Sequence, residues 1–341
     1  MPGLDTGLVL RTSPHDRGGA DTPAIMRDVV LALVPITLAA VFYFGVAAVL
    51  VIGGAVAGCV ATEAFFAPRG RRFGSVKDYS ALLTGLLLGL TLPPSFPIWM
   101  AFLGGVAAVG MGKVVWGGLG HNLFNPALVG RAFLQAAFPT AITTWSPQGS
   151  RELAVYASNL AVPFMKAPVD AITTATPLGL MKFQGTGTPL WNLVIGDTPG
   201  SLGETSALLI LLGGIYLLRK RAFDWRIPAG ILLAVAVFAG IAWAVAPATY
   251  PSPWFMLGSG GLMLGAIFMA TDPVTSPMAP MGVWIYAAGI GALVVLIRLW
   301  GGLPEGVMYA VLLMNAATPL INRAFRPTPF GRGRKVKEDS P

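Results

Sequence analysis

The chain has 341 residues, of which 55% are hydrophobic and 11% are charged. A soluble domain carries about a quarter charged residues, so this composition excludes a soluble globular protein and indicates a polytopic membrane protein. A single cysteine excludes a disulfide framework and an iron–sulfur site built by this chain alone, and two histidines add too little for a metal site of the usual composition.

Hydropathy along the chain predicts an all-α protein with about ten transmembrane helices. A polar N-terminal arm is expected at 1–25, a first five-helix repeat at 26–138, a long loop at 139–204, a second five-helix repeat at 205–322 and a basic tail at 323–341. Several apolar segments are shorter than the ~20 residues that a straight span needs. These segments are therefore expected to be broken or partly re-entrant.

The basic residues alternate along the chain and predict its orientation. The net charge of +8 is concentrated in the segment 66–79, in 219–226 and in the tail, whereas the loops at 93–97 and 247–253 carry no charge. Because Lys and Arg accumulate on the cytoplasmic side, both termini are expected in the cytoplasm and the 139–204 loop outside it. The same distribution argues against nucleic-acid binding by the tail.

The two halves of the chain share local motifs. Thr91-Leu-Pro-Pro-Ser95 ends the third segment, Thr271-Asp-Pro-Val-Thr275 ends the eighth, and the next segment opens on Trp99 and Trp284 respectively. Five spans per half is an odd number, so the second repeat is expected to be inverted relative to the first. Inverted repeats place binding sites and ion paths where broken helices meet near the midplane.

A polar stretch within the first half is a candidate ligand site. Asn122, Asn125 and Arg131 lie in it, and Asn125-Pro126 is expected to break a helix and free backbone groups. Amide side chains in such a place suit a flavin ring or an ion, and Arg131 suits a buried carboxylate or phosphate. Glu305, with Arg298 shortly before it, is expected to form an interfacial ion pair.

The segment Asp170-Ala-Ile-Thr-Thr-Ala-Thr-Pro-Leu-Gly179 is a hydroxyl-rich turn within the long loop. Pro177 is expected to keep the turn from running into a helix, and Thr176 is the residue expected to carry chemistry. The alternative is an ordinary Thr-rich loop.

Asp272 follows an apolar run and precedes a helix-breaking proline. An ionisable group within a membrane span is costly and by default functional, and the oxygens of Thr271, Asp272 and Thr275 suit a hard cation such as Na⁺. The alternative is a carboxylate that caps the following helix. No metal site and no catalytic set is expected on this chain.

In these motifs the sequence resembles the RnfD subunit of the Rnf electron-transport complex. It is more distantly similar to the NqrB subunit of the Na⁺-translocating NADH:quinone oxidoreductase. The resemblance covers nearly the whole chain. It is densest in Ala81–Pro94, Asn122–Phe133, Met269–Val274 and Pro304–Met308.

The resemblance implies covalent FMN, attached through a phosphoester to the last threonine of a Ser/Thr-Gly-Ala-Thr motif by a separate flavin transferase. The motif here reads Thr173-Thr174-Ala175-Thr176, so the acceptor corresponds to Thr176. Thr174 stands where the motif usually has glycine. A backbone with negative φ at this position would tolerate the threonine side chain. The resemblance also allows a second, non-covalent flavin such as riboflavin, for which Asn122, Asn125 and Arg131 are the candidate residues.

The function that the resemblance implies is that of an FMN-carrying subunit in the bacterial inner membrane, with the flavin loop in the periplasm. The complex, which has iron–sulfur and flavin subunits as partners, would pass electrons between ferredoxin and NAD and move Na⁺ or H⁺. A secondary transporter or channel is the alternative function. A purely structural anchor is disfavoured because Asp272 and Arg131 are costly in a membrane.

Overall fold

The computed structural model describes residues 22–67, 78–146, 155–163, 174–196, 198–204 and 206–326. Every regular element in these ranges is a helix. The first half contains α1 (Thr22–Phe44), α2 (Val46–Phe66), α4 (Ser80–Leu90), α5 (Ile98–Val109), η1 (Gly110–Val114), α6 (Pro126–Ala137) and α7 (Pro139–Ile142). The intervening interval contains η2 (Ala157–Leu160), α8 (Pro177–Gln184), α9 (Leu190–Ile195) and η3 (Leu202–Glu204). The second half contains α10 (Ala207–Arg219), α11 (Arg226–Val245), α12 (Pro253–Gly258), α13 (Leu262–Leu264), η4 (Gly265–Met269), α14 (Pro280–Trp300) and α15 (Val307–Ala324).

Within the described residues, four helices are long and apolar enough to cross a membrane, namely α1, α2, α11 and α14. Three further apolar helices in this part of the chain are shorter, namely α4, the continuous α5–η1 segment and α10. The all-helical membrane architecture expected from hydropathy is confirmed. The helix α1 begins at Thr22, within the arm expected at 1–25, while the loop basic residues at 69–77, Asp170, Thr173 and the tail beyond 326 lie outside the described residues.

The expected helix break at Asn125-Pro126 is present. The Asn125 side-chain oxygen accepts hydrogen bonds from the backbone N–H of Ala127 at 3.0 Å and of Leu128 at 3.4 Å. An N-cap asparagine followed by proline at the first helical position is a strong start signal, so α6 begins here. Two other apolar segments change from α-helix to π-helix, at η1 and at η4. Such π-helical turns occur often at functional sites.

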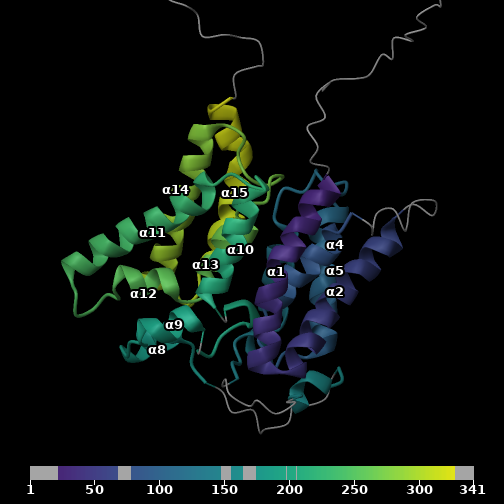
Figure 1. Cartoon of the computed structure of the whole chain (residues 1–341), viewed down its shortest axis with the longest axis horizontal. Helices are drawn as coiled ribbons and strands as arrows, with labels where there is room; N and C mark the ends of the chain where they lie inside the picture. The colour runs from purple at the N-terminus through teal and green to yellow at the C-terminus, as the bar shows by residue number, and fades with distance from the viewer. Residues whose placement is uncertain are drawn as a thin grey trace, which may run out of the picture.

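The two halves pack in corresponding ways (Figure 1). The most extensive helix contact is that of α2 with α5 in the first half and that of α11 with α14 in the second. Between the halves, α1 contacts α10 and α6 contacts α15. A shared core of buried apolar residues runs through both halves.

Glycine allows the closest of these contacts. A Cβ on Gly58 of α2 would lie 2.1 Å from the carbonyl oxygen of Phe102 on α5, and a Cβ on Gly105 would lie 2.4 Å from the oxygen of Ala55. The two backbones therefore touch directly, as small residues permit in membrane helix pairs.

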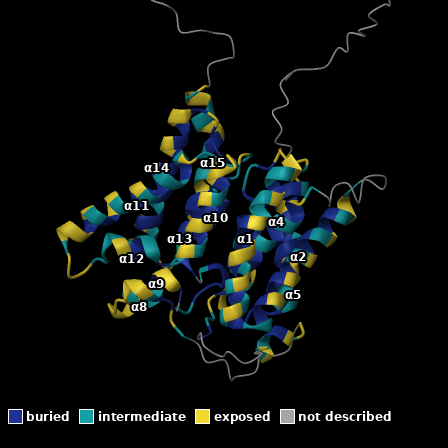
Figure 2. Cartoon of the chain, viewed as in Figure 1, coloured by how far each residue is buried: buried dark blue, intermediate teal, exposed yellow. Residues whose placement is uncertain are grey.

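The outward faces of the helices carry the exposed residues, and many of these are apolar (Figure 2). Leu38 and Phe42 on α1 are 63% and 65% exposed, and Leu313 on α15 is 58% exposed. Apolar side chains facing away from the core are what a lipid-facing surface requires, and a soluble protein rarely exposes so many.

The interval between the halves lies at the end of the bundle away from the start of α1 and the end of α15, as α8 and α9 show in Figure 1. It is fastened to the break between α4 and α5. The Asn159 side chain donates to the carbonyl oxygens of Pro94 and Phe96, both at 2.9 Å, and the Leu202 N–H donates to Leu92 O at 3.0 Å. The backbone groups that the broken helix leaves free are thus paired within the protein.

We expect Gly58→Ala to lower the free energy of unfolding by about 1–3 kcal/mol, because the added methyl group overpacks the contact between α2 and α5. The measurement is the thermal unfolding midpoint of the purified chain in detergent. Gly53→Ala is the matched control on the same helix, since a Cβ there meets nothing within 4 Å. Equal midpoints for the two variants would contradict the close approach of these helices.

Candidate functional site

Thr176 is the N-cap of α8, so the expectation that Pro177 keeps the turn from running into a helix is wrong: proline suits the first helical position, and the helix begins there. Its Oγ1 accepts a hydrogen bond from the Gly179 N–H at 3.1 Å, and Pro177 occupies the first helical position. The free N–H groups and the helix dipole at this end favour a negative group beside Thr176. The hydroxyl uses a lone pair for the cap, so its oxygen can carry a substituent without losing this bond.

A cavity of about 560 Å³ opens beside Thr176. Its walls come from the Thr-rich segment, from α6 and from the loop before α15, with Trp145, Phe183 and Tyr309 as its aromatic residues. This size is typical of a site for an organic ligand. Thr174 also lines the cavity and donates its N–H to Trp145 O at 2.9 Å. It is not among the described residues with positive φ, so its backbone tolerates the side chain that replaces glycine.

Arg131 and Glu305 form an ion pair at the inner wall of this cavity. Arg131 Nη2 lies 2.6 Å from Glu305 Oε2, and Arg131 Nη1 donates to Thr91 O at 2.8 Å. The side chains are 11% and 19% exposed. The expectation that Arg131 neutralises a buried carboxylate is confirmed, whereas the expected salt-bridge partner of Glu305, Arg298, instead donates to the carbonyl oxygens of Met256 and Ser259.

Lys182 holds α8 against the second half of the protein. Its Nζ donates to the carbonyl oxygens of Ile297 at 3.3 Å, Gly301 at 2.5 Å and Leu303 at 2.9 Å. Burial lowers the pKa of Lys182 from its ordinary value. These bonds fix Thr176 relative to the loop that carries Glu305.

A second cavity brings together Asn122, Asn125, Thr271 and Asp272. Asn122 Nδ2 lies 3.5 Å from Asp272 Oδ2, and Asn125 Nδ2 donates to Met269 O at 2.9 Å. Thr271 donates to Ile267 O at 2.7 Å, so its hydroxyl remains able to accept. The structure thus joins Asp272 to the two asparagines, and it places Arg131 in the other cavity.

The second cavity encloses about 80 Å³, which is room for a few water molecules. Thr275 is buried next to Asp272, with its hydroxyl within hydrogen-bond reach of the carboxylate. Asp272 also accepts from the Val274 N–H at 3.1 Å, which makes a local turn. The alternative that Asp272 caps the following helix is wrong, because α14 begins at Pro280 and its N-cap is Ala279. A cavity of this size has room for a small hydrated ion beside Asp272, although most of its wall is apolar.

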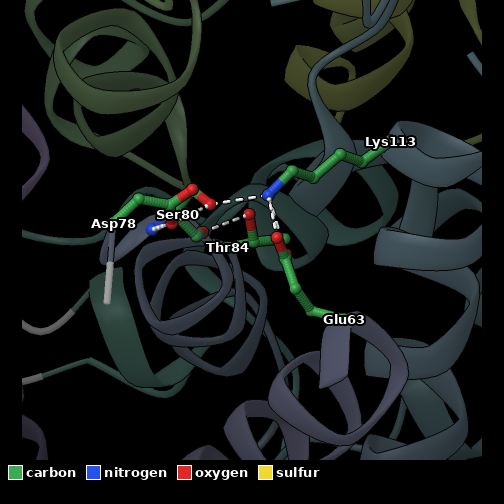
Figure 3. Close-up of polar contacts among 5 residues, drawn as sticks. All are labelled: Glu63, Asp78, Ser80, Thr84 and Lys113. Carbon is green, nitrogen blue, oxygen red and sulfur yellow. Dashed lines mark hydrogen bonds and ion pairs between the residues drawn. The ribbon is translucent and has the colours of Figure 1, made fainter. Parts of the chain in front are cut away.

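Lys113 separates the second cavity from a third one of about 320 Å³. Figure 3 shows its Nζ between Glu63 of α2 and Ser80 of α4. The nitrogen lies 2.7 Å from both carboxylate oxygens of Glu63 and 2.6 Å from Ser80 Oγ. Ser80 donates in turn to Asp78 Oδ1 at 2.6 Å. The Lys113 and Glu63 side chains are only 5% and 6% exposed, so this is a buried ion pair with further hydrogen bonds.

Comparison with known proteins assigns the family. The model of the NQR2, RnfD, RnfE family matches residues 9–331. The chain belongs to this family.

Relatives in the family match over almost their full length, and each is the D-type subunit of its complex. The chain is 41% identical over 340 residues to that of the proton-translocating ferredoxin:NAD⁺ oxidoreductase complex of Clostridium ljungdahlii, covering 96% of this chain and 97% of the relative. It is 44% identical to that of the ion-translocating oxidoreductase complex of Stutzerimonas stutzeri, covering 92% and 93%. It is 39% identical to that of the Na⁺-translocating ferredoxin:NAD⁺ oxidoreductase complex of Acetobacterium woodii, covering 98% of each. The resemblance to the RnfD subunit is confirmed.

For this member of the NQR2, RnfD, RnfE family, sequence reasoning left out Lys182, Glu63 and Glu204. Glu204 is next to Glu305 in space although 101 positions separate them, and no local pattern marks it. Glu63 lies within the apolar helix α2. The energetic cost of a carboxylate in a membrane span, which singled out Asp272, could have identified Glu63 as well. No group of three or more His, Cys, Asp or Glu side chains in the described ranges could hold a metal ion.

Lys113→Met is expected to lower the free energy of unfolding by about 3 kcal/mol, because it leaves the buried Glu63 without its cation. Adding Glu63→Gln to this variant is expected to restore part of the loss, since the uncompensated charge is then gone. The thermal unfolding midpoint in detergent is the measurement. A double variant no more stable than Lys113→Met would contradict the view that the unpaired charge is the source of the loss.

Proposed function

We propose that this chain is the FMN-carrying membrane subunit of an ion-translocating complex that passes electrons between ferredoxin and NAD, with FMN bound covalently to Thr176. The observation that supports it most is that Thr176 combines the acceptor position of the family motif with a helix N-terminus and a ligand-sized cavity. The chain acts within the complex, as the names of its relatives indicate.

The residues around Thr176 fit such a group. The N–H groups at the start of α8 favour the phosphate, and the cavity of about 560 Å³ has room for an isoalloxazine ring against Trp145, Phe183 or Tyr309. Arg131 supplies a positive charge on the wall of the cavity. The bound flavin would supply the electron-carrying chemistry, while the protein holds it in place and tunes its environment.

We further propose ten membrane spans in two inverted repeats, bounded as 26–138 and 205–322, in the bacterial inner membrane. The corresponding contacts in each half, α2 with α5 and α11 with α14, support the repeat. The location of α8 at the end opposite both described termini supports cytoplasmic termini, at 1–25 and 323–341, and a periplasmic flavin loop at 139–204.

We place the ion path at Asp272, Thr271 and Thr275, with Asn122 and Asn125 as polar lining. Support comes from the small cavity that Thr271 and Asp272 line and from the Thr275 hydroxyl beside Asp272, which offers a further oxygen ligand. The ion is Na⁺ or H⁺, since relatives of both kinds are named. The residues expected to hold a second flavin such as riboflavin are divided between two cavities, with Asn122 and Asn125 in this one and Arg131 in the other.

The proposed partners are the other subunits of the complex, including iron–sulfur and flavin subunits, and a flavin transferase that attaches FMN. Electrons must reach and leave Thr176 through those subunits. A secondary transporter is the competing function, and covalent flavin would exclude it as the sole role.

Thr176→Ala is expected to abolish covalent flavin in a chain co-expressed with a flavin transferase, because the alanine offers no oxygen for the phosphoester. The measurement is flavin fluorescence of the denatured protein in a gel. Thr174→Ala, two residues earlier, is the matched control and is expected to keep the band. A band that survives in Thr176→Ala would move the attachment to another threonine, and no band in the unaltered chain with an active transferase would favour the transporter.

Asp272→Asn is expected to slow redox-driven ion uptake by about tenfold or more, equivalent to roughly 1.4 kcal/mol in the barrier, because the ion loses a charged ligand. Uptake of Na⁺ and of H⁺ is measured in inverted vesicles that contain the complex, together with the gel assay for flavin. Asp224→Asn, in a partly exposed pair with Arg226, is the control. Full uptake by Asp272→Asn would remove Asp272 from the path.

A further inference from the structure

Four charged side chains converge behind the cavity beside Thr176. They come from different elements: Arg131 from α6, Glu204 from η3, Arg298 from α14 and Glu305 from the loop before α15. Arg131 is bonded to Glu305 at 2.6 Å, and Arg298 lies close enough to both glutamates to stabilise their charges. The cluster lies where the two halves of the protein meet.

The two glutamates contact each other directly. The Glu204 and Glu305 carboxyl groups are within hydrogen-bond contact, and the Oε1 atom of each is buried without a donor among the described residues. Both Oε1 atoms face the same turn, since a Cβ on Gly261 would lie 3.4 Å from Glu204 Oε1 and one on Gly260 would lie 3.6 Å from Glu305 Oε1.

Such a contact requires a proton. An ionised carboxylate only accepts hydrogen bonds, so two of them cannot bond to each other unless one is protonated. Two carboxylates that share a site also raise one another's affinity for a proton. One proton between Glu204 and Glu305 would therefore supply the donor that their buried oxygens lack, and direct contact leaves no room for a metal cation between them.

The surrounding charges indicate where this proton resides. Arg131 binds Glu305 and favours its ionised form. Burial, and then the neighbouring Glu305, raise the pKa of Glu204 well above its ordinary value. The other polar groups around the pair are Arg298, the Ser201 hydroxyl and the Gly261 N–H, while Lys182 is bonded to carbonyl oxygens of the nearby loop. Glu204 is the protonated partner.

The pair is connected to the cavity on one side only. Glu305 and Arg131 line the cavity, whereas Glu204 does not. A proton on Glu204 can thus pass to Glu305 and from there into the cavity. Its departure leaves two carboxylates opposite two guanidinium groups, so the emptied cluster is electrically neutral and the two arginines stabilise it.

We propose that Glu204 and Glu305 are a proton-donating pair for the redox group on Thr176. The Glu204 O–H bond breaks and Glu305 relays the proton into the cavity, where a group reduced by the upstream carrier of the complex would accept it. The pair is refilled by a proton from water at the same end of the protein. This inference rests on the proposed flavin at Thr176.

The pair is tested first without any flavin, by infrared spectroscopy of the Thr176→Ala chain at neutral pH. A C=O stretching band of a buried protonated carboxylic acid is expected, with a shift in D₂O, and it should vanish when Glu204→Gln is added. Gln keeps the size of the side chain and an N–H donor toward Glu305, so the fold is retained. Absence of any band that depends on Glu204 or Glu305 would overturn the shared proton.

The coupling is tested in the assembled complex by following flavin reduction optically at neutral and alkaline pH. Glu204→Gln and Glu305→Gln are each expected to slow reduction by about 100-fold, the usual contribution of a positioned acid. Both should weaken the pH dependence of that reduction rate. Asp224→Asn, in a partly exposed pair with Arg226, is the control and should leave both quantities unchanged.

The outcomes separate the two proposals. An unaltered reduction rate with unaltered pH dependence in both variants, with the covalent flavin band intact, would overturn the proton transfer while leaving the flavin on Thr176. Absence of covalent flavin from the unaltered chain would overturn the proposed function, whereas the infrared result would still decide whether the pair holds a proton. Fluorescence of the flavin band in each variant shows that the chain has folded and matured.

Discussion

Backbone carbonyl groups freed where a helix breaks inside a membrane protein must find hydrogen-bond donors within the protein, because lipid offers none. This constraint explains several of the polar side chains inside this protein. Arg131 donates to the last turn of α4, Arg298 to the break after α12, and Lys182 to the end of α14. Asn125 and Asn159 do the same for η4 and for the loop after α4. The broken helices and these side chains depend on each other.

Side chains held for this structural reason also form the two candidate sites. Arg131 uses one nitrogen for Thr91 and the other for Glu305, so the same guanidinium that completes α4 sets the charge at the wall of the larger cavity. Asn125 caps α6 with its oxygen and bonds Met269 with its nitrogen, which brings Asp272 next to α6. A substitution at either residue is therefore expected to affect stability and function together.

The sequence predicted those features that depend on local pattern. Apolar segments gave the helices, Asn125-Pro126 gave the start of α6, and the cost of a charge in an apolar segment indicated a carboxylate partner for Arg131. The identity of that partner, Glu305, is a contact across 174 positions that no periodicity encodes. For the same reason Asn122 and Asn125 were grouped with Arg131, which is near in sequence but faces the other cavity. Glu204 and Lys182 could not be assigned, since each acquires its role only from residues brought to it by the fold.

The ion pair between Arg131 and Glu305 joins one half of the protein to the other. Arg131 belongs to α6 of the first half and Glu305 to the loop before α15 of the second. Any sliding of one half past the other would have to stretch this bond and change the charge that the larger cavity presents. The reduction potential of a group bound in that cavity would then depend on the relative position of the halves. A change in the charge of that group would in turn favour a different relative position. The Arg131 guanidinium group would thus couple movement of the two halves to the charge in the cavity.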